Sequence, residues 1–283
     1  MRVLDSGLGV SIQDRGRPGW RRFGVPIGGS MDPHAASCAN RLLDNDPGAA
    51  LIELLLQGSR LEMLQDAWIA LCGAPIECSI PTWRAYPAQA GEVVSIKKCR
   101  SGMWSYLAVE GGFSAKPFFG SASFYGRGNL GTRLSAGSLL ERNSSARFHL
   151  AAGVSGRVAS WEDQRDYASP PRIRVWPGPQ WNDFSPADRD TFLTAEWKIS
   201  PQSDRVGYRL EGPRLPANPP EIVSEPVRLG SVQVPENGQP IITMRDGPTV
   251  GGYPKIALID EEHDLPWVAQ ARPGETIRFQ LIS

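Results

Sequence analysis

Side chains that can bind and activate an amide gather in one stretch near the end of the chain. Residues 230–256 are rich in glycine and proline, and they include Gln233, Asp246, Thr249 and Tyr253. A carboxamide or hydroxyl can hydrogen-bond to an amide, a carboxylate can act as a general base, and a phenol can donate to a developing oxyanion. Closely spaced turn residues are also typical of ordinary loops with surface ion pairs. The stretch alone leaves both interpretations open.

A second polar segment lies earlier, at residues 202–212. It contains Arg205, Arg209, a tyrosine and two acidic residues between glycines. Guanidinium groups form paired hydrogen bonds with carboxylates and phosphates. Arg205 and Arg209 are therefore candidates for holding an anionic group, and a surface ion-pair network is the alternative.

Other kinds of chemistry have little support in the sequence. Residues 126–131 read G-x-G-x-x-G, but no helix is expected after them and no acidic residue stands about 20 positions downstream, so we reject a dinucleotide site. The chain has neither a Walker A motif nor a G-x-S-x-G motif. His34 and Cys38 stand one helical turn apart, but no spacing supplies the two further ligands of a zinc site, so no metal is predicted.

The composition is that of a globular protein with many turns. The 283 residues suffice for one large domain or two ordinary ones, and 41% of them are hydrophobic and 21% charged. A formal net charge of +0 gives no sign of a nucleic-acid partner. The 30 glycines and 25 prolines favour short strands joined by turns, so we expect a mainly β fold with few short helices.

Short strands and two helices are the elements expected to position the polar side chains. One helix should begin after Asp32, an N-cap residue followed by Pro33, and another after Ser185. Strands are expected at residues 51–56, 67–71, 93–96, 106–109, 139–140 and 276–279. Similar small turns precede several of these strands, which fits two barrel-like halves.

A domain boundary is expected around residues 156–177, where a polar stretch at residues 161–167 is followed by Pro170 and Pro171. It divides the chain into an N-terminal β-rich domain, residues 1–160, and a C-terminal domain, residues 170–283. Four cysteines without a C-x-x-C pair, and an N-terminus without an apolar leader, favour a reduced, cytoplasmic protein. The uncharged stretch at residues 67–76 is far shorter than the roughly 20 residues that span a membrane.

Motifs spread over nearly the whole chain support a more specific interpretation. They occupy residues 13–19, 23–26, 30–33 and 107–112 in the first half, and residues 203–205, 207–210, 233–235, 238–240 and 251–255 in the second. In this order they resemble the biotin-dependent carboxyltransferase family, also called the allophanate hydrolase subunit 2 family. The resemblance implies two β-rich domains, with a cyclophilin-like barrel in the second half.

The resemblance also implies a function. Stand-alone bacterial members are mostly assigned as the C subunit of 5-oxoprolinase, one of three components of an enzyme that hydrolyses ATP and opens 5-oxo-L-proline to L-glutamate. The other two are a kinase-inhibitor-type subunit and a lactam-utilisation-type subunit. ATP, with Mg²⁺, is then expected at the level of the complex. No biotin is expected on this chain, which lacks the Met-Lys-Met biotinyl motif.

Within this resemblance, roles can be assigned to the polar side chains. The catalytic candidates are Asp246, Gln233 and Tyr253. The substrate-binding candidates are Arg205, Arg209, Thr249 and Lys255. Asp246 would be the base or would orient the amide, Tyr253 would donate to the oxyanion, and the arginines would hold a carboxylate or phosphate.

Some positions depart from the pattern of the family. Many relatives have arginine and aspartate where this chain has Thr132 and Ser138, and a different sequence at residues 122–124. Two other functions therefore stay open. One is a carboxyltransferase component that acts on urea-like amides with biotin on another chain, and the other is a non-enzymatic regulator that binds a kinase-inhibitor-like partner.

Overall fold

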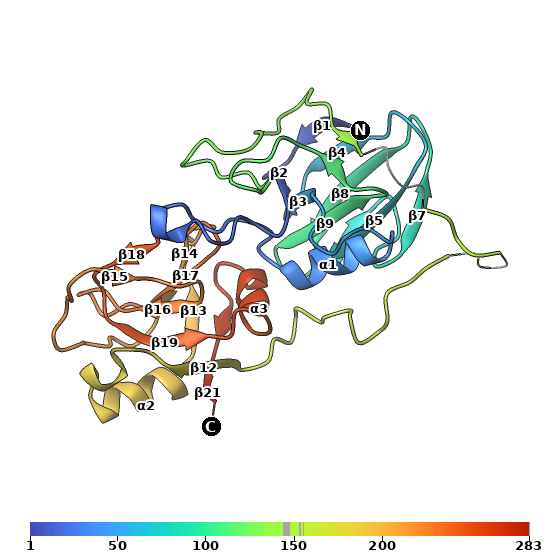
Figure 1. Cartoon of the computed structure of the whole chain (residues 1–283). Helices are drawn as coiled ribbons and strands as arrows, with labels where there is room; N and C mark the ends of the chain where they lie inside the picture. Colours follow the sequence, from blue (N-terminus) through green and yellow to red (C-terminus); the bar gives the residue numbers. More distant parts are fainter. Residues whose placement is uncertain (144–147, 153, 155, 283) are drawn as a thin grey trace. The chain divides into compact units, whose positions relative to one another are not determined.

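The computed structural model describes residues 1–143, 148–152, 154 and 156–282. Strands dominate this part of the chain, which has three short α-helices: α1 (Pro33–Arg41), α2 (Pro186–Thr194) and α3 (Leu265–Gln270) (Figure 1). The mainly β fold class predicted from the composition is therefore confirmed. Among the described helices, none combines the length and the hydropathy needed to cross a bilayer.

The chain divides into two compact units. Unit 1 consists of residues 1–17 and 28–168, and unit 2 consists of residues 18–27 together with the chain from residue 169 onward. The sequence prediction had placed residues 18–27 in the first domain. Side-chain contacts hold these residues on unit 2, because Arg21 donates hydrogen bonds to the carbonyl groups of Val227 and Pro248.

Unit 1 is built from two β-sheets around one core. The first has the strand order β1 (Arg2–Ser6), β4 (Ser59–Glu62), β8 (Val93–Cys99), β6 (Ile76–Cys78). The second has the order β2 (Val10–Gln13), β3 (Leu51–Leu55), β9 (Trp104–Val109), β5 (Ala67–Gly73), β7 (Ala85–Ala88). Apolar side chains of both sheets share a single cluster, in which Val94 and Leu107 are fully buried. A two-stranded ribbon, β10 (Phe113–Ser114) and β11 (Glu141–Arg142), completes the unit.

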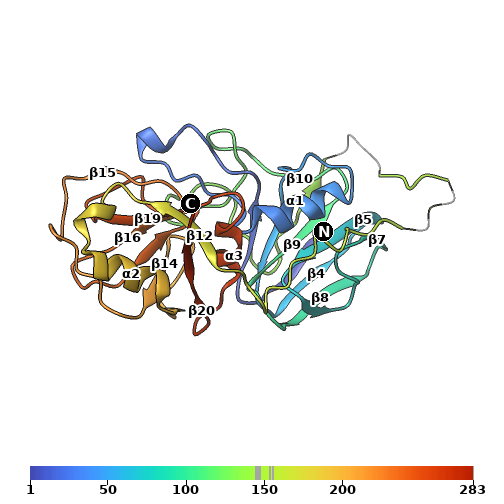
Figure 2. The ribbon, with the colours of Figure 1, turned by 90° about the horizontal axis from the view of Figure 1, so that it is seen from below.

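Helix α1 packs against β5 and β9 and begins where the sequence predicted (Figure 2). The Asp32 carboxylate accepts a hydrogen bond of 3.1 Å from the Ala35 N–H, and proline occupies the first turn. Three of the predicted strands, at residues 51–56, 67–71 and 106–109, lie together as β3, β5 and β9. The strand expected at residues 139–140 is wrong, because Leu139 forms only an isolated bridge.

A buried network, here called the unit 1 network, fixes the N-terminus of α1. The Tyr106 hydroxyl donates to Glu53 at 3.0 Å and accepts from the Asp32 N–H at 2.7 Å, and the Tyr167 hydroxyl donates to the Asp32 carboxylate at 2.7 Å. Burial raises the pKa of both phenols well above the ordinary value, and the nearby carboxylates Glu53 and Asp32 add to the shift. The phenols therefore stay protonated and serve as donors.

Unit 2 is a nearly closed barrel. Its sheet has the order β20 (Thr276–Ile277), β13 (Trp197–Ile199), β14 (Gly207–Glu211), β17 (Ile241–Thr243), β16 (Ser231–Gln233), β19 (Lys255–Ile259), β12 (Ile173–Pro177), β21 (Phe279–Leu281). The two edge strands, β20 and β21, are separated in the sequence by Arg278 alone, so the sheet curls back on itself. Curling in this way removes exposed edges, and it confirms the barrel expected in the second half.

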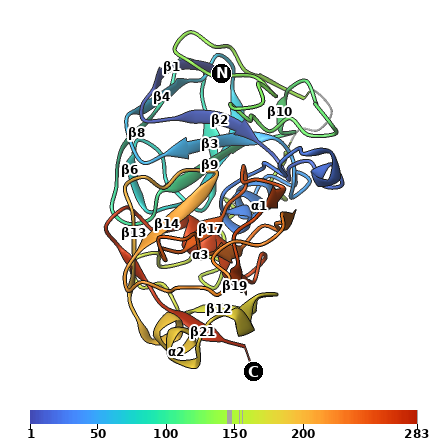
Figure 3. The ribbon, with the colours of Figure 1, turned by 90° about the vertical axis from the view of Figure 1, so that its left-hand side faces the viewer.

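Helix α2 covers part of the outside of this barrel (Figure 3). It begins at the predicted cap, where the Ser185 hydroxyl accepts from the Asp188 N–H at 3.1 Å. Phe192 of α2 stacks on Phe279 of β21 with ring centroids 4.5 Å apart. A short ribbon, β15 (Glu225–Pro226) and β18 (Val250–Gly251), and the 3-10 turns η1 (Arg21–Phe23) and η2 (Trp181–Asp183) complete the unit.

Candidate functional site

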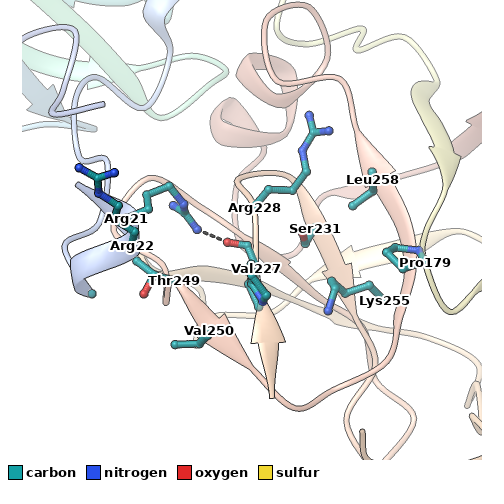
Figure 4. A pocket seen from close by; sticks show the side chains of 12 residues that line it. Arg21, Arg22, Pro179, Val227, Arg228, Ser231, Thr249, Val250, Lys255 and Leu258 are labelled. Atoms are coloured by element: carbon teal, nitrogen blue, oxygen red, sulfur yellow. Dashed lines mark hydrogen bonds between the residues drawn. The ribbon is translucent and has the colours of Figure 1, made fainter. Parts of the chain in front are cut away.

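A cavity of about 610 Å³ opens in unit 2 beside the β15–β18 ribbon (Figure 4). Strands β16 and β19 contribute Ser231, Lys255 and Leu258 to its wall, and η1 contributes Arg21 and Arg22. This volume is ordinary for a site that encloses a small molecule. We call this space the barrel cavity.

Lys255 supplies a buried positive charge in the barrel cavity. Only 2% of its side chain is exposed, and its Nζ lies 2.6 Å from Oε1 of Glu225. Gln180 donates to the same oxygen at 2.9 Å, and its own Oε1 accepts from the Lys255 backbone N–H at 3.0 Å. Hydrogen bonds from Lys255 and then Gln180 lower the pKa of the Glu225 carboxyl, so this carboxyl is ionised at neutral pH.

One buried hydroxyl of the barrel cavity lacks a hydrogen-bond partner. Within the described part of the chain, Ser231 Oγ has none, whereas Lys255 Nζ is paired with the Glu225 carboxylate at 2.6 Å. Ser231 is fully buried and lies on β16, beside β19. A buried donor without an acceptor lowers the stability of the fold by roughly 1–3 kcal/mol, so such a donor commonly binds a ligand or a water molecule. We call Ser231 and Lys255 the cavity floor.

Arginines stand around the mouth of the barrel cavity. Arg21 is tied to the carbonyl groups of Val227 and Pro248, the first contact being the dashed line in Figure 4. Burial lowers the pKa of Arg21, although a guanidinium stays charged at any physiological pH. The side chains of Arg22 and Arg228 extend away from Lys255 (Figure 4). None of the described residues that line the cavity is acidic, so its potential favours an anion.

Two of the sequence-predicted site residues, Thr249 and Lys255, line the barrel cavity. Gln233 does not line it, although it is buried nearby on β16, where its Nε2 donates to the Thr243 hydroxyl at 2.9 Å. Its Oε1 lies beneath Gly251, where an added Cβ would approach it to 2.9 Å. Gln233 thus supports the ribbon that borders the cavity.

Arg205 and Asp246 are brought together, but they bind each other. Nε and one terminal nitrogen of Arg205 donate to the two carboxylate oxygens of Asp246 at 2.9 and 3.2 Å. The Asp246 backbone N–H also donates to the Arg205 carbonyl at 2.8 Å. With 8% of Asp246 exposed, this is a nearly buried two-point ion pair. Their predicted roles as carboxylate clamp and base stay predictions.

The remaining two candidates lie on the surface. Arg209 points outward from β14, between the buried side chains of Tyr208 and Leu210. Tyr253 is 39% exposed in the loop before β19. Neither residue lines the barrel cavity, so the seven candidates do not form one constellation.

The sequence prediction missed four polar residues of the barrel cavity: Arg21, Arg22, Arg228 and Ser231. The position of Arg21 and Arg22 between the family-like motifs at residues 13–19 and 23–26 was the one hint in the sequence that they matter. That hint did not place them at a site, because Arg21 contacts Val227, which lies 206 positions further along the chain. Only the fold shows that contact.

Unit 1 contains a mixed cluster that the sequence also left incomplete. One ligand-type atom from each of His34, Cys38 and Asp163 lies within 4.8 Å of the others. However, the Arg41 guanidinium lies 3.1 Å from the Cys38 sulfur and 3.3 Å from the Asp163 carboxylate, and His34 Nε2 is 2.8 Å from the Asp163 carbonyl. The Arg41 guanidinium is therefore the cation of this cluster, and the cluster's contacts hold residues 157–168 against α1.

One departure from the family pattern has a local structural role in unit 1. The Ser138 hydroxyl accepts from the Ser135 N–H at 3.0 Å, which is the turn-closing task that an aspartate also performs. Between the departing positions 122 and 124, the Ser123 hydroxyl donates to Asp14, as the Ser121 hydroxyl does at 2.6 Å. Both loops are therefore held by side-chain hydrogen bonds.

Comparisons with known proteins identify similar chains. The family model described as "Carboxyltransferase domain, subdomain A and B" matches residues 23–281. The C subunit of 5-oxoprolinase from Escherichia coli (strain K12) is 38% identical over 99% of this chain and 90% of its own length. The crystal structure of TTHA0988 superposes with a TM-score of 0.88 at 34% identity, covering 99% of this chain and 55% of that chain. The crystal structure of Kluyveromyces lactis urea carboxylase gives 0.91 at 28% identity, covering 100% of this chain and 27% of the other.

Proposed function

This chain belongs to the carboxyltransferase-domain family, subdomain A and B, and from that membership we propose that it is a subunit of an ATP-dependent 5-oxoprolinase. The complex would open 5-oxo-L-proline to L-glutamate. Similarity to the C subunit of the Escherichia coli 5-oxoprolinase supports this, because it extends over 99% of this chain and 90% of that protein. The partners would be one kinase-inhibitor-type subunit and one lactam-utilisation-type subunit.

The observation that carries the proposal is the charge of the barrel cavity. Its lining has four basic side chains and, among the described residues, no acidic one: Arg21, Arg22, Arg228 and Lys255. 5-Oxoproline is a carboxylate at neutral pH, whereas urea is uncharged. Glu225, which is not part of the lining, offsets the charge of Lys255 at 2.6 Å, and the three guanidiniums leave the cavity positive. A positive cavity favours the anion, so the geometry supports the lactam over urea.

The chemistry divides between the complex and this chain. A lactam is a stable amide, and ATP with Mg²⁺, bound at the level of the complex, would supply the driving force for opening it. This chain would hold and orient the substrate in the barrel cavity. Asp246, held by Arg205, is the proposed base or amide-orienting carboxylate, and Gln233 the proposed polar support beneath the ribbon.

Reconstitution of the complex tests the proposal. The chain would be co-expressed with the two partner-type subunits, and glutamate release and ATP hydrolysis would be measured with and without 5-oxo-L-proline. We expect activity only with all three subunits, stimulated by 5-oxo-L-proline and insensitive to avidin. Rapid turnover by the purified chain alone would contradict a subunit role, and assembly without any turnover would favour a regulatory binding protein.

A carboxyltransferase component is the second candidate. Superposition of all of this chain on part of Kluyveromyces lactis urea carboxylase, with a TM-score of 0.91, favours it. Biotin would then arrive on another polypeptide. Activity on urea that requires bicarbonate and is blocked by avidin, with none on 5-oxoproline, would establish this function in place of the first.

A further inference from the structure

We propose that the cavity floor, Ser231 and Lys255, binds the carboxylate group of a small monocarboxylic acid whose apolar body lies against Leu258 and Val250. The identity of that acid as 5-oxo-L-proline rests on the proposed function. The site differs from the arginine clamp expected from the sequence, because Arg205 is bound to Asp246 and Arg209 is exposed.

The first argument is that the floor offers two buried donors to an anion. The hydroxyl of Ser231 is fully buried and has no hydrogen-bond partner among the described residues, and Lys255, which is 2% exposed, is paired with a single carboxylate, that of Glu225 at 2.6 Å. A carboxylate accepts several hydrogen bonds at two oxygens. Both side chains line the same cavity, so we infer that one anion lies between them and accepts from both, and hydrogen bonds to a charged group are the stronger kind.

The second argument concerns the position of Glu225. Its side chain is 37% exposed while that of Lys255 is 2% exposed, so Glu225 contacts the ammonium from the solvent side. Gln180 holds Glu225 there with a hydrogen bond of 2.9 Å. An ammonium has three N–H donors, and Glu225 can take only part of them. The rest are available to an acceptor inside the cavity.

The third argument is the apolar wall, which separates a carboxylic acid from inorganic phosphate. Pro179, Val227, Val250 and Leu258 line the same cavity, and Figure 4 shows Pro179 and Leu258 on the side of Lys255. Such a wall suits methylene groups, and a phosphate gains nothing from it. Phosphate sites usually supply several backbone N–H groups or paired guanidiniums, and here Arg21 is already bound to carbonyl groups.

Direct binding to the full-length chain tests the site. Calorimetric titrations would compare 5-oxo-L-proline, 2-pyrrolidinone (the same lactam without its carboxylate) and inorganic phosphate. We expect 5-oxo-L-proline to bind at least about tenfold more tightly than 2-pyrrolidinone, because a charge-assisted hydrogen bond is worth that much. It should also bind more tightly than phosphate, because phosphate gains nothing from the apolar wall. Equal affinity for 2-pyrrolidinone, tighter binding of phosphate, or no binding of the acid would each overturn the proposal.

Two variants with matched controls locate the binding. Ser231→Ala should weaken 5-oxo-L-proline binding by about tenfold, and Lys255→Met by about a hundredfold. The exposed residues Ser169 and Lys198 provide the controls Ser169→Ala and Lys198→Met, which should change nothing. Unchanged affinity in both floor variants would refute the site.

The melting temperature without ligand separates a binding role from a structural one. Ser231→Ala breaks no hydrogen bond to a described residue and removes a buried, unsatisfied hydroxyl, so its melting temperature should be equal to or higher than that of the parent. A marked loss of thermal stability would show that the hydroxyl has a structural role instead.

The two proposals can fail separately. If the complex shows no 5-oxoprolinase activity but acid binding still depends on Ser231, the site stands and the proposed function fails. If the complex turns over normally with both Ser231→Ala and Lys255→Met, the function stands and the site is wrong.

Discussion

The unit 1 network and the cavity floor of unit 2 are both buried and polar, but they differ in completeness. In unit 1, Tyr106 bridges Glu53 and the Asp32 N–H, and the Asp32 carboxylate accepts from a second phenol. In unit 2, the hydroxyl of Ser231 has no partner within the described chain, and Lys255 has an ion pair on its solvent side.

This difference teaches how to distinguish a structural polar cluster from a binding site. A complete network gains from each hydrogen bond and fixes one conformation, here the start of α1. An incomplete network destabilises the protein without ligand, because a buried donor has no acceptor, and a ligand that accepts from this donor removes the penalty. Residue types do not separate the two cases, since carboxylates and hydroxyls occur in both.

The Arg205–Asp246 pair provides the strongest test of this distinction, because it is complete and yet predicted to be catalytic. If Asp246 is the base, Asp246→Asn should lower turnover of the reconstituted complex by about 10²–10⁴-fold, since the amide keeps the shape but loses the basicity. Glutamate release by the assembled complex measures this.

A second ion pair in unit 2 supplies the matched control. Asp264 is 2% exposed and binds Nε and the backbone N–H of Arg174, both at 2.9 Å. Asp264→Asn should destabilise the fold to a similar extent and leave turnover per assembled complex nearly unchanged. If both variants keep full turnover, Asp246 is structural, as the unit 1 network is.

Breaking the unit 1 network should have the largest effect on stability. Asp32→Ala removes the N-cap of α1 and leaves the Tyr167 hydroxyl without its acceptor. A lost cap costs about 1 kcal/mol and a buried unsatisfied hydroxyl about 1–3 kcal/mol, so the free energy of unfolding should fall by about 2–4 kcal/mol. Urea denaturation measures it.

Asp46 is the control for this prediction. Its side chain is 71% exposed and pairs with an exposed arginine at 3.1 Å. Asp46→Ala should change the free energy of unfolding by less than about 1 kcal/mol. A similar small change for Asp32→Ala would show that the network does not stabilise the unit.

The unit 1 network also predicts loss of stability at alkaline pH. Burial raises the pKa of Tyr106 and Tyr167 well above the ordinary value of 10.0, so the folded chain keeps protons that the unfolded chain releases. The stabilisation is complete below pH 10 and is lost as pH rises beyond it, by at most about 1.4 kcal/mol per pH unit for each phenol. Urea denaturation at several pH values between 9 and 11 measures this loss.

The double variant Tyr106→Phe, Tyr167→Phe tests the cause of that loss. Phenylalanine cannot titrate, so the variant should be less stable at pH 8 but should show a shallower decline above pH 10. An unchanged decline would assign the alkaline loss to other groups.

The sequence predicted those parts of the fold that depend on local signals. Asp32 and Ser185, each followed by proline, marked two helix starts, and apolar runs bounded by turns marked β3, β5 and β9. Helix α3 was missed because it has six residues and carries no side-chain cap. The strand expected at residues 139–140 failed since its pattern was two apolar residues after a turn, which loops also have.

The site was less predictable because its geometry comes from distant contacts. Lys255 and Thr249, which belong to one Gly/Pro-rich segment, line the same cavity, and their role in substrate binding stays a prediction. Residue chemistry suggested that Arg205 was free to bind substrate, but the fold pairs it with Asp246. No local pattern reports that the Ser231 hydroxyl has no hydrogen-bond partner among the described residues, since that depends on how β16 packs beside β19.

Glu225→Gln is the most specific test of the comparison. Lys255 is 2% exposed, so the amide leaves a buried ammonium without its counter-charge and should lower the free energy of unfolding, which urea denaturation measures. The pKa of Glu225 is lowered by Lys255 and Gln180, so its contribution is present above the ordinary value of 4.5 and is lost as pH falls through the folded value. The variant should therefore be less sensitive to acid.

Glu225→Gln should also bind 5-oxo-L-proline several-fold more tightly, because the neutral amide no longer offsets the Lys255 charge that attracts the carboxylate. Calorimetry at low and high salt measures this gain, which should shrink as salt screens the charges. Weaker binding would mean that Glu225 positions Lys255 for the ligand, and the floor would then count as a complete network of the kind found in unit 1.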